Sequence, residues 1–339
     1  MASRASFLLL VLLVVAAAAA SPALSPPPPS CNAADLHALL AVKQSLGNPK
    51  TLSTWSPSSP DCCKWDHVRC DDASGRVNNV FIDGADDVRG QIPSAVAGLT
   101  SLMSLSLFRL PGLSGTIPPC LATLPQPAVS SPSPTPTCPG PIPDHLARIR
   151  TLDSVDLSNN RLTGCIPAAF ADLPNLRSLD LRHNQLTGPI PAGLVQGQFR
   201  SLILSYNQLS GPIPRDDAQD EINTVDLSHN RLTGDASHLF VPGRPIGKVD
   251  LSWNDLDFDL SKAVFPPELT YLDLSHNRIH GTVPPSLGKL STLQKLDLSY
   301  NRLCGPLPRF HGVIKHGCQA YEHNQCLRGA PIETCHQFS

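Results

Sequence analysis

The sequence predicts an α/β-type repeat solenoid, a right-handed superhelix in which each coil adds one short strand to a parallel sheet on the concave face. Two observations predict this fold. A leucine or isoleucine stands two positions after each of seven regularly spaced asparagines, and a glycine stands four positions after all but one of them. A fixed period of this length is typical of stacked leucine-rich repeats rather than of one globular core. The asparagines recur at intervals of 24, 23, 23, 24, 23 and 24 residues, at Asn160, Asn184, Asn207, Asn230, Asn254, Asn277 and Asn301.

The repeats are expected to span residues 75–305. Apolar and polar residues alternate around Val155, Asp156 and Leu157, which predicts a short strand whose aliphatic side chains point inward. The asparagine that follows is expected to turn the chain and to bond backbone groups of neighbouring coils. A Leu-x-Gly-x-Ile-Pro segment then returns the chain, and this pattern resembles the extracellular leucine-rich repeats of plants. Counting by the glycine position, with Phe258 in place of one glycine, gives ten coils, at Gly90, Gly115, Gly140, Gly164, Gly188, Gly211, Gly234, Phe258, Gly281 and Gly305.

The third coil departs from this pattern. Its strand position, residues 126–137, holds four prolines and no leucine. Proline cannot donate to a strand ladder, so an ordinary strand is excluded there. Gly115 and Gly140 nevertheless remain 25 residues apart. We therefore expect a degenerate coil that keeps its length but loses its leucines.

The amino-terminal 74 residues contain an export signal and a cap. Residues 1–24 join Arg4 to a short apolar run and then to small residues, which is typical of a secretory signal peptide rather than of a membrane anchor. Residues 25–74 are expected to form the cap, with a helix over residues 33–46 that begins after Asn32 as its N-cap. No later apolar stretch is long enough to span a membrane. The sequence therefore predicts an exported protein.

Eleven cysteines in an exported chain indicate disulfides. Four cysteines precede the repeats and four follow them, so disulfide-clamped caps should cover the apolar ends of the solenoid, the second over residues 306–339. Cys120, Cys138 and Cys165 allow at most one further pair, whose members stay open. A zinc site is an alternative for the cysteines and histidines of residues 316–336, but export favours a disulfide-bonded cap.

Charge and motifs limit the class of function. The chain has 26 basic and 28 acidic side chains, which argues against a nucleic-acid partner. Aspartates on adjacent strands would reach the separation of about 5 Å that retaining glycosidases use. Catalysis, however, needs two carboxylates in different environments, and a repeated column gives each aspartate nearly the same one. The sequence therefore predicts a recognition protein without a cofactor or metal, and not an enzyme.

Two columns of side chains should line the concave face, because successive strands stack about 4.8 Å apart. Tyrosine, tryptophan and histidine suit protein interfaces, and an exposed row of them suggests a use. The alternative for an aspartate of the repeat is a solvated side chain that contacts no partner. The asparagines are expected to be structural. The first column holds Asp156, Asp180, Ile203, Asp226, Asp250, Asp273 and Asp297. The second column holds Asn159, His183, Tyr206, His229, Trp253, His276 and Tyr300.

The two columns carry electrostatic expectations. Stacked carboxylates create a field that favours basic partners and disfavours polyanions, and they should raise one another's pKa. Histidines titrate near pH 6.5 when unperturbed, so those of the second column should be largely protonated near pH ~5. Binding should therefore change between pH ~5 and pH ~7.

The chain resembles the plant polygalacturonase-inhibiting proteins over nearly its whole length after the signal peptide. The amino-terminal cap carries the run from Asp61 to Cys70 with its doubled cysteine, a pattern that some receptor ectodomains share. Residues 234–240, followed by 258–262 and the Phe265-Pro266 pair, are distinctive of the family. Residues 321–335 resemble the family's carboxy-terminal cap, although Arg328 stands where the family has a cysteine.

This resemblance implies a protein of the plant cell wall that binds fungal or insect endopolygalacturonases through its concave face and so slows the digestion of pectin. It also implies the disulfides Cys31–Cys62, Cys63–Cys70 and Cys304–Cys326. Because Arg328 replaces a cysteine, Cys318 is the partner expected for Cys335. We expect a monomer, with pectin as a lower-ranked partner. The alternative is a non-inhibitory, receptor-like adaptor or developmental regulator that binds a peptide or a receptor ectodomain.

Overall fold

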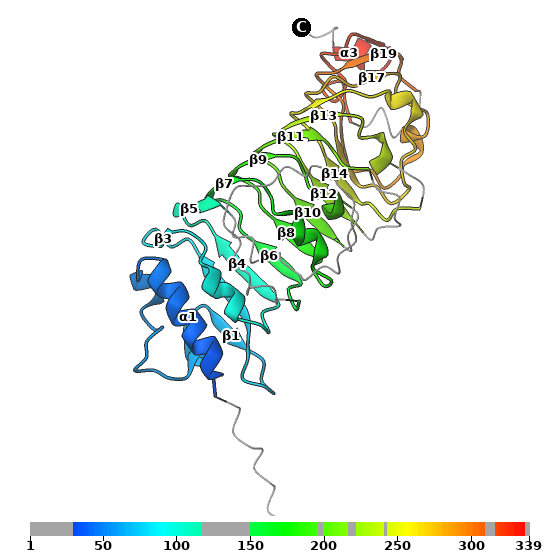
Figure 1. The fold of residues 1–339 in the computed structure, drawn as a ribbon. Helices are drawn as coiled ribbons and strands as arrows, with labels where there is room; N and C mark the ends of the chain where they lie inside the picture. Colours follow the sequence, from blue (N-terminus) through cyan, green and yellow to red (C-terminus); the bar gives the residue numbers. More distant parts are fainter. Residues whose placement is uncertain are drawn as a thin grey trace, which may run out of the picture.

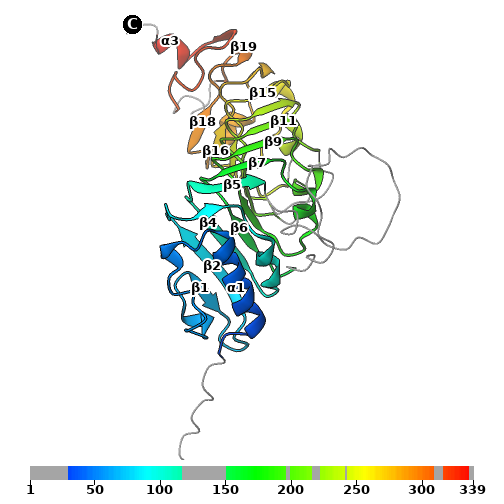
Figure 2. The ribbon, with the colours of Figure 1, turned by 60° about the vertical axis from the view of Figure 1, so that its left-hand side comes forward.

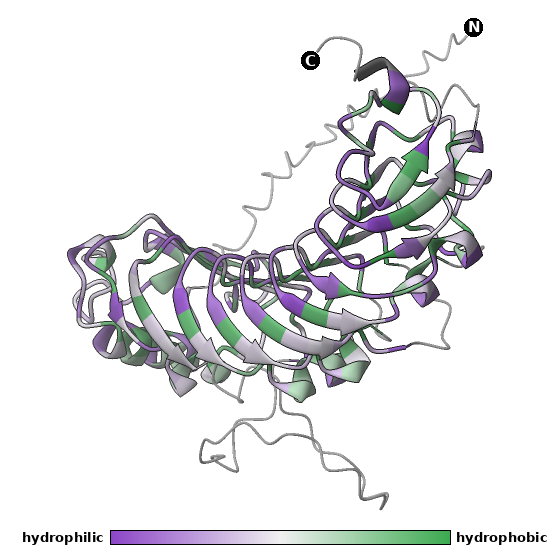
Figure 3. Cartoon of the chain, turned by 90° about the horizontal axis from the view of Figure 1, so that it is seen from above, coloured by the Kyte–Doolittle hydropathy of each residue, from purple (hydrophilic) through white to green (hydrophobic). Residues whose placement is uncertain are grey.

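The computed structural model describes residues 30–116, 150–195, 199–215, 222–240, 243–308 and 316–335. These residues form a solenoid whose coils follow one another along an arc (Figures 1 and 3). The expected signal peptide, residues 1–24, lies outside the described residues. No helix in the described part of the chain is long and apolar enough to cross a membrane.

The concave sheet has ten strands in the part of the chain that the structure describes. The first strand pairs antiparallel with the second, and the remaining strands are parallel and in register, so that equivalent residues of successive coils lie side by side. The inward residues, such as Val155 and Leu157, are fully buried, as the alternation predicts. In spatial order the strands are β1 (Val68–Cys70), β2 (Val77–Asp83), β4 (Ser104–Phe108), β6 (Ser154–Asp156), β8 (Ser178–Asp180), β10 (Ser201–Ile203), β12 (Thr224–Asp226), β14 (Lys248–Asp250), β16 (Tyr271–Asp273) and β18 (Lys295–Asp297).

A second set of short strands follows the asparagine turns and makes a further layer. Seven of them form one sheet and three form another among the described residues. Short 3-10 turns, such as η5 (Ala168–Asp172) and η9 (Leu287–Lys289), then return the chain to the next coil. The strands are β3 (Arg89–Gly90), β5 (Gly112–Thr116), β7 (Arg161–Gly164), β9 (Gln185–Gly188), β11 (Gln208–Pro212), β13 (Arg231–Gly234) and β15 (Asp255–Leu256), and then β17 (His280–Gly281), β19 (Arg302–Pro306) and β20 (Cys326–Arg328).

The repeated asparagines form the expected ladder. The Asn254 amide nitrogen donates to Leu227 O of the preceding coil at 3.0 Å and to Leu251 O of its own coil at 3.1 Å. Its Oδ1 accepts from Leu232 N at 2.9 Å. Asn254 is only 9% exposed, so water cannot replace these hydrogen bonds. Each asparagine thus satisfies backbone groups of two coils, and the period of the sequence follows from this requirement.

The prediction of about ten coils exceeds the described structure by one, because β4 pairs directly with β6. Ser104 and Ser106 pair directly with Ser154 and Asp156. The side chain of Asn160 also reaches across to Leu107 O at 2.6 Å. Nine of the ten strands in the concave sheet of the described residues are therefore mutually parallel, one for each coil. Residues 126–137 lie outside the described residues, and their lack of inward leucines explains why a coil at this position would add nothing to the core.

The amino-terminal cap covers the first coil. Helix α1 (Ala33–Ser45) begins after Asn32, whose Oδ1 accepts from Ala34 N at 2.9 Å, and it lies at the end of the solenoid (Figure 2). Asp35 is fully buried and holds the Arg76 guanidinium through two hydrogen bonds of 2.8 and 2.9 Å. This buried pair fixes the helix on the chain that leads into β2.

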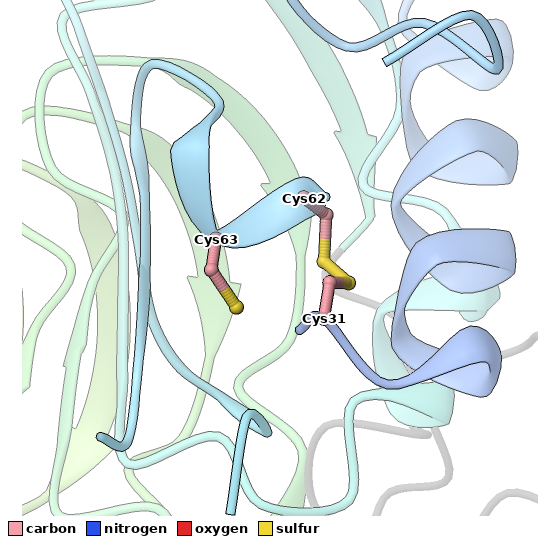
Figure 4. A group of neighbouring side chains, drawn as sticks. All are labelled: Cys31, Cys62 and Cys63. Carbon is pink, nitrogen blue, oxygen red and sulfur yellow. A yellow bond between two sulfur atoms is a disulfide. The ribbon is translucent and has the colours of Figure 1, made fainter. Parts of the chain in front are cut away.

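Disulfides fasten this cap. Cys31 is joined to Cys62 in η2 (Cys62–Lys64), while Cys63 points away from that pair (Figure 4). Cys63 is joined to Cys70 of β1. These are the pairs that the family resemblance implies. The three sulfur atoms of Cys31, Cys62 and Cys63 lie close together. Because all three cysteines are disulfide-bonded, none is left as a thiolate that could bind a metal.

The carboxy-terminal cap adds one more turn to the asparagine ladder. Asn324 follows Asn301 by 23 residues, and its Oδ1 accepts from Leu303 N at 3.0 Å while its amide donates to Leu298 O at 2.9 Å. Cys304 is bridged to Cys326, across the β19–β20 pair. Cys318 is also disulfide-bonded. The side chain of its expected partner, Cys335, lies outside the described residues, as do Cys120 and Cys138.

Candidate functional site

The predicted aspartate column lies in register on the concave sheet, interrupted by Ile203. Asp226, Asp250, Asp273 and Asp297 occupy equivalent positions on four adjacent strands. In each of these four coils one carboxylate oxygen accepts from the hydroxyl of a serine two residues later, at 2.6–2.8 Å. Asp156 makes the same contact with Ser158. One oxygen of each carboxylate therefore closes the end of its strand, which is the structural role that the sequence left open.

Several of these aspartates hold their protons more tightly than usual. Burial raises the pKa of Asp180 to about 6, an effect that the Arg182 contacts oppose and Asp156 reinforces. Burial also raises the pKa of Asp273 to about 6, and the neighbouring carboxylates Asp250 and Asp297 add to the shift. The pKa of Asp250 is raised for the same reasons. Mutual repulsion thus acts in the predicted direction, but loss of water is the larger cause.

The aspartate column is not a plain negative stripe, because some of its charges are compensated. The Arg182 guanidinium lies 3.3 Å from Asp180, and the Lys295 ammonium lies 3.1 Å from Asp297. The phenolic oxygen of Tyr271 donates to Asp250 at 3.2 Å. The negative character of the concave face therefore depends on pH, and Asp226 and Asp273 form no ion pair among the described residues.

The predicted ring column is a continuous stack. His183, Tyr206, His229, Trp253, His276 and Tyr300 lie nearly parallel, with adjacent centroids 3.8–5.3 Å apart. Each residue has a left-handed backbone with φ between 52° and 56°. Its own N–H still donates to the next coil, for example from Trp253 N to Ser275 O at 3.0 Å. The left-handed backbone thus leads the chain into the asparagine turn. It also directs one ring from each of these six coils to the same side of the sheet.

Stacking decides which atoms a partner can reach. Inner rings cover one another's faces, so that ring edges are left to meet solvent, although Nδ1 of His276 is buried. Tyr206, Trp253 and Tyr300 remain 44%, 49% and 46% exposed. Because each ring is held by its neighbours, binding would immobilise few side chains that were free before. The column is therefore a preorganised surface of aromatic edges, the composition that marks protein interfaces.

Two histidines of this column hold a proton less tightly than an unperturbed imidazole. Burial lowers the pKa of His229, although Asp250 and Asp226 oppose the shift. Burial likewise lowers the pKa of His276. The reason is that neighbouring rings replace the water that would stabilise an imidazolium ion.

Sequence reasoning missed three parts of this face. His323, in the carboxy-terminal cap, stacks on Tyr300 at 4.1 Å with the same left-handed backbone and extends the column to seven rings. The interval of 23 residues from Asn301 to Asn324 was the signal for it. At the other end, Phe81 and Met103 are 49% and 51% exposed on the strands and turns of the first two coils. Phe81 takes the position of the aspartate column in the first coil, since it pairs with Ser106 and Ser106 pairs with Asp156.

The fold and this face together define a leucine-rich-repeat protein whose concave sheet is suited to binding another protein. Residues 32–71 match the model of the leucine rich repeat N-terminal domain, and residues 150–209 and 247–303 match that of the leucine rich repeat.

Comparison with known proteins gives the family. Polygalacturonase inhibitor 1 of Oryza sativa subsp. japonica is 77% identical over 307 residues, which cover 91% of this chain and 92% of that protein. Polygalacturonase inhibitor 2 of Arabidopsis thaliana is 39% identical over 90% of this chain and 92% of its own length. A plant ice-binding protein of known structure is 34% identical, with a TM-score of 0.67 over 89% of this chain and 97% of that chain. The chain belongs to the polygalacturonase inhibitor family.

Proposed function

We propose that the protein is exported to the plant cell wall, where it binds fungal or insect polygalacturonases through its concave face and inhibits them. The observation that carries this proposal is the stacked ring column beside an aspartate column on one uninterrupted sheet. Family membership supports it, because relatives similar over nearly their whole length are named as inhibitors of these enzymes.

The chemistry of the partner fits this face. Polygalacturonate is a polyanion, so an enzyme that grips it needs basic groups along its cleft. Carboxylates of the concave face would attract that cleft and raise the association rate. The ring edges of Tyr206, His229 and Trp253 would supply the desolvated contacts that slow dissociation. Pectin ranks below the enzyme as a partner, because the polymer shares the sign of charge of the aspartate column.

The test is a panel of purified fungal and insect endopolygalacturonases assayed with the wild-type protein. We expect inhibition of at least one enzyme, and about a tenfold or larger loss of affinity in the double variant Trp253→Ala, Asp226→Asn. The matched control changes His280→Ala and Asp257→Asn, an exposed histidine–aspartate pair away from the concave sheet, and should inhibit like the wild type.

Two outcomes would count against the proposal. Undiminished inhibition by the Trp253 and Asp226 double variant would remove the concave face from the mechanism. Absence of inhibition across the panel, together with capture of a receptor ectodomain, would favour the adaptor alternative. Sedimentation of the purified protein tests the expectation of a monomer.

A further inference from the structure

The carboxy-terminal cap presents one additional row of the concave face. Backbone hydrogen bonds run from Leu298 N to Ala320 O at 2.7 Å and from Tyr300 N to Glu322 O at 3.0 Å, in the pattern that joins earlier coils. Ala320 therefore takes the position of the aspartate column, and His323 takes that of the ring column. The Cys304–Cys326 disulfide and Asn324 hold this row in place. The cap is thus part of the presented surface as well as a cover for the core.

Glu322 differs from every aspartate of the column. In the four coils directly before the cap, its position holds a buried serine, such as Ser299, which donates to the aspartate of its own coil. In the cap, Ala320 offers no carboxylate to close the turn. Glu322 is half-buried, and no hydrogen bond or ion pair occupies its carboxylate in the part of the chain that the structure describes. At the same position Arg182 reaches the concave face, where it meets Asp180, which shows that a long side chain there can do so.

His323 is the last ring of the stack. Tyr300 covers one face of its imidazole at 4.1 Å, and no described ring covers the other. The residue is exposed. The end of the column therefore offers one open ring face, and the residue before it in the chain carries an unused carboxylate, whereas inner rings offer edges.

We infer that Glu322 and His323 form a docking point for an arginine side chain of the inhibited enzyme. A guanidinium is planar, stacks on ring faces and forms paired hydrogen bonds with carboxylates, so one group can add an eighth rung to the column and bind Glu322. Lysine could pair with the carboxylate but could not continue the stack. This inference rests on the proposed function for the identity of the partner, since a cleft for a polyanion is where exposed arginines are expected.

The first experiment measures dissociation constants for a fungal endopolygalacturonase that the wild-type protein inhibits. Glu322→Gln and His323→Ala should each weaken binding about tenfold, and the double variant should lose less than the product of the two because both contact one guanidinium. The matched controls are Glu268→Gln and His280→Ala, which remove a carboxylate and an exposed imidazole elsewhere. Unchanged affinity in both cap variants, with weakened binding by Trp253→Ala, would overturn the inference and leave the proposed function intact.

The second experiment tests the site without the enzyme. Nuclear magnetic resonance of the full mature chain would follow the His323 and Glu322 side chains during addition of N-acetyl-arginine amide, and separately of N-acetyl-lysine amide. Saturable shifts with the arginine compound, larger than those with the lysine compound and lost in Glu322→Gln, are expected. Equal shifts with both compounds, or none with either, would overturn the inference even if the enzyme panel gave no inhibition.

Discussion

Lowering the pH should weaken the attraction of the concave face for a basic partner, because buried carboxylates of this face take up protons. Asp180 and Asp273 have pKa values raised to about 6 by burial. Each carboxyl is then about 90% ionised at pH ~7 and about 10% ionised at pH ~5, so the pair loses about 1.6 negative charges over this range. Protonation of the ring column would add to this loss of attraction, but the lowered pKa values of His229 and His276 reduce their share of it.

The association rate constant is the quantity to measure, because long-range attraction acts mainly on association. At low ionic strength we expect the rate with an inhibited endopolygalacturonase to fall on the order of tenfold between pH ~7 and pH ~5. Salt at about 0.15 M should reduce that difference, since screening shortens the reach of the field.

A double variant separates this effect from titration of the enzyme. Asp180→Asn with Asp273→Asn keeps oxygen acceptors for the backbone of the strand ends but cannot ionise. The ratio of the wild-type rate to the variant rate should exceed one at pH ~7 and approach one at pH ~5. A ratio that stays constant over this range would refute the assignment of the pH dependence to these two carboxyls.

Three further predictions concern the scaffold. Asn254→Ala leaves one N–H and two carbonyls of the ladder without partners and should lower the free energy of unfolding by about 3–5 kcal/mol. The control Asn223→Ala, at an exposed position, should lower it by about 1 kcal/mol or less. Equal losses in denaturant titrations would argue against the ladder. Deletion of residues 117–141 joins Thr116 to a second Ile-Pro segment and should leave the circular dichroism spectrum and inhibition unchanged, because β4 already pairs with β6; loss of folding would contradict that pairing. The pKa of Asp180 is raised from 3.8 to about 6 in the folded state. Between these two pH values the folded chain binds more protons than the unfolded chain, so stability falls as the pH rises. Asp180→Asn should therefore raise the melting temperature at pH ~7 but not at pH ~4, and an equal gain at both pH values would be inconsistent with burial of the charge.

The fold was predictable because its period comes from one local requirement. Every coil must satisfy the same backbone groups, and an asparagine at a fixed interval does so, as Asn254 illustrates. Glycine spacing gives one coil too many because it marks a coil between Gly115 and Gly140. Glycine marks a turn, but inward aliphatic side chains make a coil favourable. Residues 126–137 have no leucine to bury, so β4 gains more by pairing with β6 directly.

The candidate site was predictable only in part. Columns follow from sequence spacing, so the positions of Asp226 and Trp253 could be assigned without coordinates. The ion-pair partners of the carboxylates could not be assigned in this way. Arg182 pairs with Asp180 and Lys295 pairs with Asp297 only because of the conformations that their long side chains adopt. The lowered pKa values of His229 and His276 could not be predicted for a similar reason, since they depend on how closely the rings pack.

The same backbone geometry builds the scaffold and displays the site, yet it uses different residues for the two tasks. Leucines and asparagines face inward and satisfy the coil, while the residue before each asparagine is held in a left-handed turn that points outward. Any side chain placed there is aligned with its neighbours without disturbing the core. His229, Trp253 and Tyr300 can therefore be exchanged at little cost to the ladder. If the proposed function holds, a change of target enzyme would need changes in the ring and aspartate columns and would leave the asparagines untouched.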